Sequence, residues 1–246
     1  MIKLIIQMTK VVITILSLLL LQSCVNTNWG NETISGNGKI VEVNRTVTEP
    51  FNAISAKNGL EIIITPESNV SIVVDADENL QDHIFTEVKE GTLIIYSDVN
   101  IMDAEAKKIH VSASNINKIV SSSGATVKSK KELNYSNLEL ESSSGSTINI
   151  DVAANSLFCE SSSGSSIRVK GKANSINTKS SSGSSIHLEQ LLAENGVASA
   201  SSGSTTKVQV TNELKAEASS GASINYYAKP NSLIVDESSG GSIRSK

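Results

Sequence analysis

The heptapeptide SSSGSSI at Ser161–Ile167 decides the fold, because close copies of it recur through the second half of the chain. Aligned on their glycines, seven copies follow one another at separations of 21, 19, 19, 20, 18 and 19 residues. One motif per period of about 20 residues predicts one structural unit per repeat, stacked as a solenoid. The seven glycines are Gly124, Gly145, Gly164, Gly183, Gly203, Gly221 and Gly240.

The apolar residues around each glycine indicate that the unit is built from β-strands. They stand an odd number of residues away from the glycine, whereas the positions an even number away carry serine, threonine or charged residues. This alternation is the period of a β-strand. The sequence therefore predicts an all-β, single-domain parallel β-helix with coils of about 20 residues, stacked ~4.8 Å apart. The inward column three residues after each glycine is Val127, Ile148, Ile167, Ile186, Thr206, Ile224 and Ile243.

The glycine itself is expected at a bend that needs a positive φ or a close backbone approach. The residues directly beside it, also at odd steps, are almost all serine, alanine or glycine, which fit a narrow stacked corner. Serine hydroxyls that point inward need hydrogen-bond partners, and a stacked ladder of coils supplies them.

The N-terminal half is less regular but related to the repeat. The stretch around Gly59, NAISAKNGLEIIITP, has the same alternation and is interpreted as a divergent coil. An acidic start and the spacing of Leu80 and Ile84 predict a short helix within residues 77–85, which is expected to cover the open end of the solenoid. We expect one domain over residues 40–246.

The first residues have the pattern of a targeting segment. Lys3 and Lys10 supply positive charge, and the apolar run Val11–Leu21 is too short to span a membrane. The sequence LQSC at Leu21–Cys24 resembles the bacterial lipobox, which implies a lipid on Cys24, a signal peptide over residues 1–23 and a flexible tether over 24–39. The alternative is an ordinary secretory signal with a chance cysteine. Cys159, at an inward position, is expected to be a small buried thiol.

Composition excludes several classes of function. With 21 basic and 25 acidic residues the net charge is −4, so nothing favours nucleic acid as a partner. The three histidines have no metal-ligand spacing and no nucleotide-binding motif occurs, so neither a metal nor a cofactor is predicted.

Two outward columns carry the candidate chemistry. Four residues after the glycines stand Lys128, Arg168, His187, Lys207 and Arg244, interrupted by two asparagines; we call these five residues the basic stripe. It is either a solvated face or a ladder for the phosphate or carboxylate groups of an extended envelope polymer. Four residues before the glycines, Glu141 and Glu160 are expected to stack on adjacent coils. They are either solvated charges or the acid pair of a polysaccharide-acting enzyme.

Taken together, the lipobox, the stretch EPFNAISAKNGLEIII at Glu49–Ile64 and the SSSGS coils resemble the putative auto-transporter adhesin, head GIN domain family. The resemblance implies a β-helical fold and an envelope location, and it supplies no catalytic residues. We therefore expect a non-enzymatic, lipid-anchored protein of the cell envelope, in the outer membrane. It would act as an adhesin, binding or scaffold module toward polysaccharide or envelope proteins.

Overall fold

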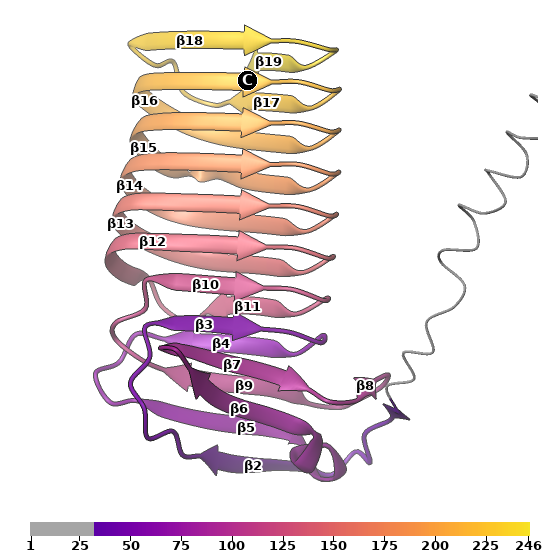
Figure 1. Cartoon of the computed structure of the whole chain (residues 1–246). Helices are drawn as coiled ribbons and strands as arrows, with labels where there is room; N and C mark the ends of the chain where they lie inside the picture. The colour runs from indigo at the N-terminus through magenta and orange to yellow at the C-terminus, as the bar shows by residue number, and fades with distance from the viewer. Residues whose placement is uncertain (1–31) are drawn as a thin grey trace, which may run out of the picture. The chain divides into compact units, whose positions relative to one another are not determined.

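Residues 32–246 are described by a computed structural model, so the predicted signal peptide and Cys24 lie outside the described residues. This part of the chain is a β-solenoid of about seven turns with about 19 residues per coil, which confirms the predicted fold (Figure 1). None of its helices is long and apolar enough to cross a membrane. Its central strands are β12 (Leu133–Ser142), β13 (Thr147–Ser161), β14 (Ser166–Ser180), β15 (Ser185–Ala200) and β16 (Thr205–Ala218).

The coils pair in parallel and keep one register at the corner, with register shifts only after Arg168 and between Leu188 and Asn195. Ile148 is the Cα partner of Ile167, and Ile167 is the partner of Ile186, so the repeated isoleucines form one column. All three are fully buried, as the odd and even positions predicted. Shorter strands complete the two ends of this region: β10 (Lys118–Ser121), β11 (Thr126–Ser129), β17 (Ser223–Tyr226), β18 (Ser232–Glu237) and β19 (Ser242–Ser245).

Each repeat glycine lies in a tight corner between two strands. Gly164 has a φ of 69° and Ser163, just before it, a φ of 53°, so two consecutive residues are left-handed. The predicted positive φ is confirmed at all seven glycines. Close approach is not the cause at Gly164, because a Cβ there would meet nothing within 4 Å. The expectation that the residue before the glycine points inward was wrong, since the turn interrupts the alternation and Ser163 is exposed.

The serine just after the glycine is buried and bonds to the coil before it. The Ser165 hydroxyl donates to the Ser142 carbonyl at 2.6 Å, and Ser184 makes the equivalent bond to Ser161 at 2.7 Å. Ser146 and Ser204 repeat the bond in their own coils, at 2.7 and 2.9 Å. The predicted ladder of hydroxyl partners is therefore confirmed.

The order of coils in the stack differs from their order in the sequence. The divergent coil around Gly59 consists of β3 (Ala53–Ala56) and β4 (Glu61–Thr65) and has the same left-handed corner. On one side it pairs with β10 and β11, and on the other with β7 (Thr92–Ser97) and β9 (Lys107–Ser112). The later strands β7 and β9 are therefore farther from the repeats than β3 and β4 (Figure 1).

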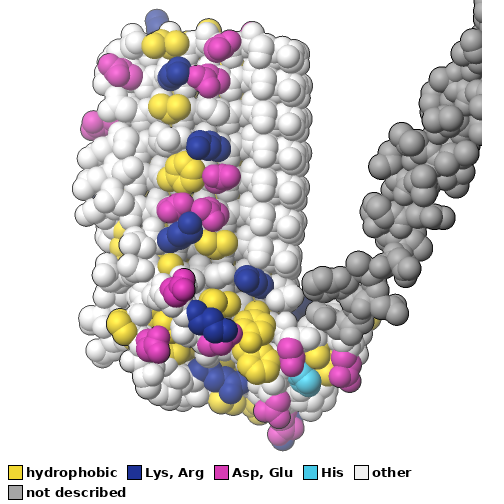
Figure 2. Space-filling model, in the orientation of Figure 1, with side chains coloured by type: hydrophobic (Ala, Val, Ile, Leu, Met, Phe, Trp, Pro, Cys, Tyr) yellow, Lys and Arg dark blue, Asp and Glu magenta, His cyan; other side chains and the backbone are white. Residues whose placement is uncertain are grey.

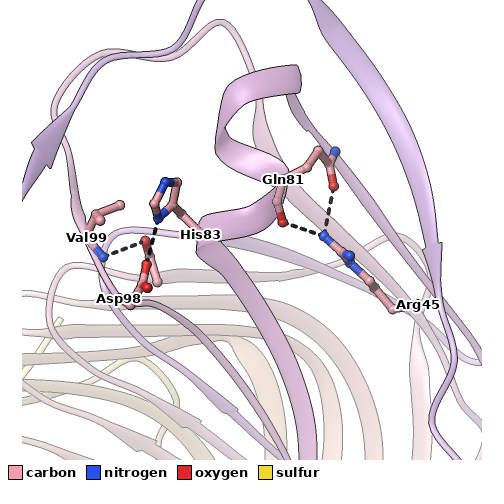
Figure 3. A network of polar contacts seen from close by, with 6 residues as sticks. Arg45, Gln81, His83, Asp98 and Val99 are labelled. Carbon is pink, nitrogen blue, oxygen red and sulfur yellow. Dashed lines mark hydrogen bonds and ion pairs between the residues drawn. The ribbon is translucent and has the colours of Figure 1, made fainter.

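Antiparallel strands close the N-terminal end of the solenoid. These are β6 (Ile84–Lys89) against β7, β5 (Ser71–Asp77) against β9, and β2 (Ile40–Arg45) against β5. The predicted helix is the 3₁₀ helix η1 (Glu78–His83), whose Leu80 is fully buried. Arg45 ties β2 to η1 by donating to the carbonyl and side-chain oxygens of Gln81, at 2.6 and 3.0 Å (Figure 3).

Part of the segment expected to be a tether is held against this end. Strand β1 (Thr33–Ile34) pairs with β8 (Asn100–Ile101). The Gly38 amide donates to the side chain of Asp77 at 2.8 Å, and this fully buried carboxylate also accepts the Ala106 amide at 2.9 Å. Within the described residues, the chain from Thr33 onward is therefore part of the folded unit.

The corner conformation yields a test at Gly164. We expect Gly164→Val to lower the free energy of unfolding clearly more than Gly164→Asn, because a left-handed φ costs an ordinary L residue roughly 1–2 kcal/mol and asparagine less. Since the space around Gly164 is open, crowding should add nothing. Denaturant unfolding followed by circular dichroism measures the difference. Equal effects of the two substitutions would contradict the conformational explanation.

Candidate functional site

The solenoid has two broad faces that meet at the Ser-Gly corner. We call the outward side of the strands that enter the corner, including β3, β10 and β18, the front face. We call the outward side of the strands that leave it, including β4, β11 and β19, the rear face. The front face is in the foreground of Figure 1.

The rear face brings the basic stripe into one line. Arg168 is the Cα partner of His187, and His187 is the partner of Lys207. Two asparagines continue the column, Asn149 between Lys128 and Arg168, and Asn225 between Lys207 and Arg244. Neighbouring positions in such a column lie ~4.8 Å apart. The structure thus arranges the five predicted residues as a ladder with one side chain per coil.

Carboxylates neutralise part of the stripe. Lys128 forms an ion pair with Glu61 at 2.6 Å, and Glu189 lies within ion-pair distance of both His187, at 3.2 Å, and Lys207, at 3.6 Å. Burial is the largest single influence on Glu189 and by itself raises its pKa. The hydrogen bonds and the charges of His187 and Lys207 outweigh it together, so the pKa of Glu189 is lowered. Within residues 32–246, Arg168 and Arg244 make no ion pair. Sequence reasoning missed Glu189, although its place two residues after His187 puts it on the same face.

A column of hydroxyl groups runs beside the stripe, two residues after each glycine. Some of these hydroxyls bond to one another between coils, as Ser185 does to Ser166 at 3.1 Å and Thr205 to Ser223 at 3.3 Å. The rear face therefore offers cationic groups and hydroxyls at the same regular spacing. Both kinds of group bind phosphate or carboxylate oxygens.

The front face carries mixed charges. Figure 2 shows basic, acidic and hydrophobic side chains alternating along it, beside the uncharged Ser-Gly corner. Glu141 and Glu160 are Cα partners, as expected, but Lys118 donates to Glu141 at 2.7 Å and to Glu139 at 3.2 Å. Burial raises the pKa of Glu141, yet the bonds to Lys118 and Glu139 outweigh it and the pKa is lowered. A general acid needs the opposite shift, so this geometry does not favour an acid pair.

A shallow groove crosses the front face next to the corner. It is lined by Glu160, Lys179, Glu217 and Asp236 together with serines of the corner, and it is open to solvent. Phe158 borders it, with the Lys179 ammonium 5.5 Å from the centre of its ring. Among the described residues, no serine hydroxyl that lines the groove is hydrogen-bonded to one of its carboxylates or to Lys179.

Neither Cys159 nor the histidines form a reactive centre. Cys159 is a free, fully buried thiol, as predicted, and burial raises its pKa, which keeps it protonated. Among residues 32–246, no group of three or more His, Cys, Asp or Glu side chains is placed to hold a metal ion.

An asparagine ladder marks the bend on the side away from the Ser-Gly corner. The Asn174 amide donates to Asn155 at 3.3 Å, Asn212 to Asn195 at 2.9 Å and Asn231 to Asn212 at 3.3 Å. Sequence reasoning missed it, although these five asparagines also recur at about the coil period. Stacked side-chain amides stabilise parallel coils in the same way as other in-register amide ladders.

These features define a class of protein, a parallel β-solenoid with one end closed by antiparallel strands and with regular outer columns of side chains. Residues 50–230 match the family model described as putative auto-transporter adhesin, head GIN domain, so the chain belongs to that family. An adhesin-like family indicates a cell-envelope or surface protein and suggests a role other than catalysis.

Solved structures share the fold. A putative adhesin from Bacteroides fragilis superposes with a TM-score of 0.80 at 21% identity, covering 87% of this chain and all of that one. A putative lipid binding protein from Parabacteroides distasonis gives 0.72 at 18% identity, also covering 87% and 100%. A putative adhesin from Parabacteroides merdae gives 0.68 at 16% identity, covering 87% and 99%. No curated protein matches the chain.

The contact of Glu141 with Lys118 yields a pH-dependent prediction. Because the pKa of folded Glu141 is lowered, the carboxylate stabilises the fold above its ordinary pKa of 4.5, and the effect is lost as the pH falls through the lowered value. We expect Glu141→Gln to cost ~0.2–1 kcal/mol at pH 7, as is typical of an exposed ion pair. The cost should be smaller at pH 3 than at pH 7, and it disappears once the pH is below the lowered pKa of Glu141.

The matched control is Glu160→Gln on the next coil, because Glu160 makes no ion pair within the described residues. Denaturant titrations at both pH values measure the two variants. A cost for Glu141→Gln that persists undiminished in acid would contradict the electrostatic assignment.

Proposed function

We propose that the protein is a non-enzymatic, lipid-anchored component of the cell envelope, held in the outer membrane, that binds an extended anionic polymer along its rear face. The observation that carries the proposal is the in-register column of Arg168, His187 and Lys207, with Lys128 and Arg244 farther along the same line. An envelope polysaccharide that bears phosphate or carboxylate groups is the partner that such a ladder fits.

The spacing favours a polymer over a small ligand. Each exposed contact between a cation and an anion is worth only ~0.2–1 kcal/mol, so affinity must come from several rungs engaged together. Arg168 and Arg244 provide the strongest rungs, because neither guanidinium has a carboxylate partner within the described residues and each can bind an anion with two hydrogen bonds. Glu61 and Glu189 weaken the neighbouring rungs, which keeps the binding reversible and sensitive to salt.

A non-enzymatic role is supported by the front face. The stacked pair Glu141 and Glu160 was the basis for the alternative of a polysaccharide-acting enzyme. The lowered pKa of Glu141 and its bond to Lys118 make it a poor proton donor near neutral pH. Similar solved structures described as putative adhesins also favour binding over catalysis.

The proposed anchor is a lipid on Cys24, supported by the sequence alone. A charged start, the short apolar run Val11–Leu21 and the sequence LQSC are the pattern that directs lipid attachment in bacteria. Acyl chains that each contribute ~0.8 kcal/mol per buried methylene would hold the protein at a membrane.

Charge reversal on the rear face tests the proposed polymer binding. We expect Arg168→Glu combined with Lys207→Glu to weaken retention on immobilised polygalacturonate about tenfold or more, since each reversal replaces an attraction by a repulsion. The control combines Lys179→Glu with Lys215→Glu, which makes the same change of net charge on the front face. Retention should fall steeply with salt only where the stripe is intact. Equal retention of both double variants would assign the stripe to solvation.

Replacing the lipid attachment residue tests the anchor. We expect Cys24→Ser to abolish labelling by a radioactive fatty acid and to shift the protein from the detergent phase to the aqueous phase. Cys159→Ser serves as the control for loss of a thiol, because Cys159 is buried inside the solenoid. Detergent partitioning of Cys24→Ser like that of the wild type would contradict lipid attachment.

A further inference from the structure

The N-terminal end of the front face carries a stacked pair of aromatic rings. Phe85 on β6 and Tyr96 on β7 are Cα partners in an antiparallel hairpin. Their ring centroids are 5.2 Å apart and their planes are inclined by 18°. Ile84 and Ile95, which directly precede the two aromatic residues on their strands, are buried. Because successive side chains of a strand point to opposite faces, both rings point outward, and Phe85 is 37% exposed.

This pair is notable because the chain contains few aromatic residues. The full sequence has one tryptophan, four tyrosines and three phenylalanines in 246 residues, and the buried hydrophobic core consists of isoleucine, leucine, valine and alanine with one cysteine. The core therefore does not use Phe85 or Tyr96. Exposed rings that stack on each other leave an apolar surface in contact with water, which is a common mark of a binding site.

Polar side chains surround the rings, and their formal charges cancel. On one side His83 contacts Asp98 at 3.0 Å (Figure 3), and on the other Lys89 pairs with Glu87 at 2.9 Å. Lys57 lies beside Tyr96, because it follows Ala56, the Cα partner of Ile95. Two lysines thus balance two carboxylates. Figure 2 shows this end of the front face as a hydrophobic cluster bordered by basic, acidic and histidine side chains.

An open groove continues from the rings along the same hairpin. Its lining includes Val88, Ile94 and Val120 as apolar groups, Ser55, Thr92 and Lys89 as hydrogen-bonding groups, and the carboxylates of Glu49 and Glu90. Ile94 lies two residues before Tyr96 on β7, so it shares the outward side of the strand with that ring. The rings and the groove therefore form one amphipathic surface.

We propose that this surface, the Phe85–Tyr96 platform and its groove, binds an uncharged pyranose sugar of a glycan. A pyranose ring has an apolar face of C–H groups that packs on aromatic rings, and a rim of hydroxyls that bonds to serine, threonine, lysine and carboxylate side chains. The charges beside the rings cancel and Glu49 and Glu90 make the groove acidic, so an acidic sugar is disfavoured, which distinguishes this site from the basic stripe. The proposal is independent of the proposed polymer binding on the rear face.

Saturation-transfer NMR on the full-length protein tests the proposal. The probes are the methyl glycosides of glucose, galactose, mannose and N-acetylglucosamine. The charged comparison is the methyl glycoside of galacturonic acid, with its carboxylate free. We expect at least one neutral probe to receive saturation at its ring protons. Phe85→Ala combined with Tyr96→Ala should lower the transfer at least ~5-fold, since the stacking surface is lost.

Three further variants separate binding from folding. Phe85→Leu keeps apolar bulk on the hairpin, so it should fold and still lose most of the transfer, whereas Tyr96→Phe keeps the ring and should retain it. Tyr227→Ala, at a tyrosine that is 39% exposed and far along the chain, should change nothing. The rear-face charge reversals should also leave the transfer intact. Absence of transfer to every neutral probe, stronger transfer to the charged probe, or full transfer to a folded Phe85→Leu variant would overturn the proposal.

Discussion

The hydrogen bond from each buried corner serine to a carbonyl of the preceding coil is the interaction on which the rest of this structure depends. Ser146, Ser165, Ser184 and Ser204 make this bond at equivalent positions, so it links the central coils to one another, whereas alanine or glycine stands there in the other three repeats. Each of these carbonyls also accepts a backbone amide, as Ser142 does from Ser162 at 3.0 Å, so the serine adds a second bond worth ~0.5–1.5 kcal/mol. A shift of one residue would also turn the isoleucine column outward. The corner therefore fixes the register, and the register fixes both the core and the surface.

The surface inherits the periodicity of the corner. Any residue type repeated at one position of the coil becomes a straight column, whether it is the basic stripe on the rear face or the asparagine ladder at the opposite bend. Such columns are suited to polymers that repeat, and they offer few ways to build a single enclosed pocket. The irregular groups gather at the N-terminal end, where antiparallel strands and η1 close the stack. The aromatic platform lies at that end, on an antiparallel hairpin that is not part of the repeat.

The sequence alone was sufficient to predict the features that repeat along the chain. Odd and even steps around the glycines predicted the buried isoleucines, and the glycines predicted the left-handed corner. The left-handed Ser163 escaped prediction, because alternation assumes a continuous strand and the turn interrupts it. The sequence also did not predict that β3 and β4 lie between two pairs of later strands, β10 with β11 and β7 with β9. The order of strands along the chain gives no information about a stack that is not sequential. The pairing of Phe85 with Tyr96 depends on a hairpin closed by Glu90 and Gly91, both with positive φ, and it becomes visible only once that turn is known.

The central claim, that the coils stack in a single register and so turn repeated residues into straight columns, is tested most directly by one distance. Spin labels at Asn149→Cys and Asn225→Cys, in a Cys24→Ser background, lie four coils apart on the same column, while buried Cys159 is protected from labelling. Double electron–electron resonance should give one narrow distribution centred near 19 Å, which is four steps of ~4.8 Å. A broad distribution, or a centre displaced by a coil step of ~5 Å or more, would contradict the account.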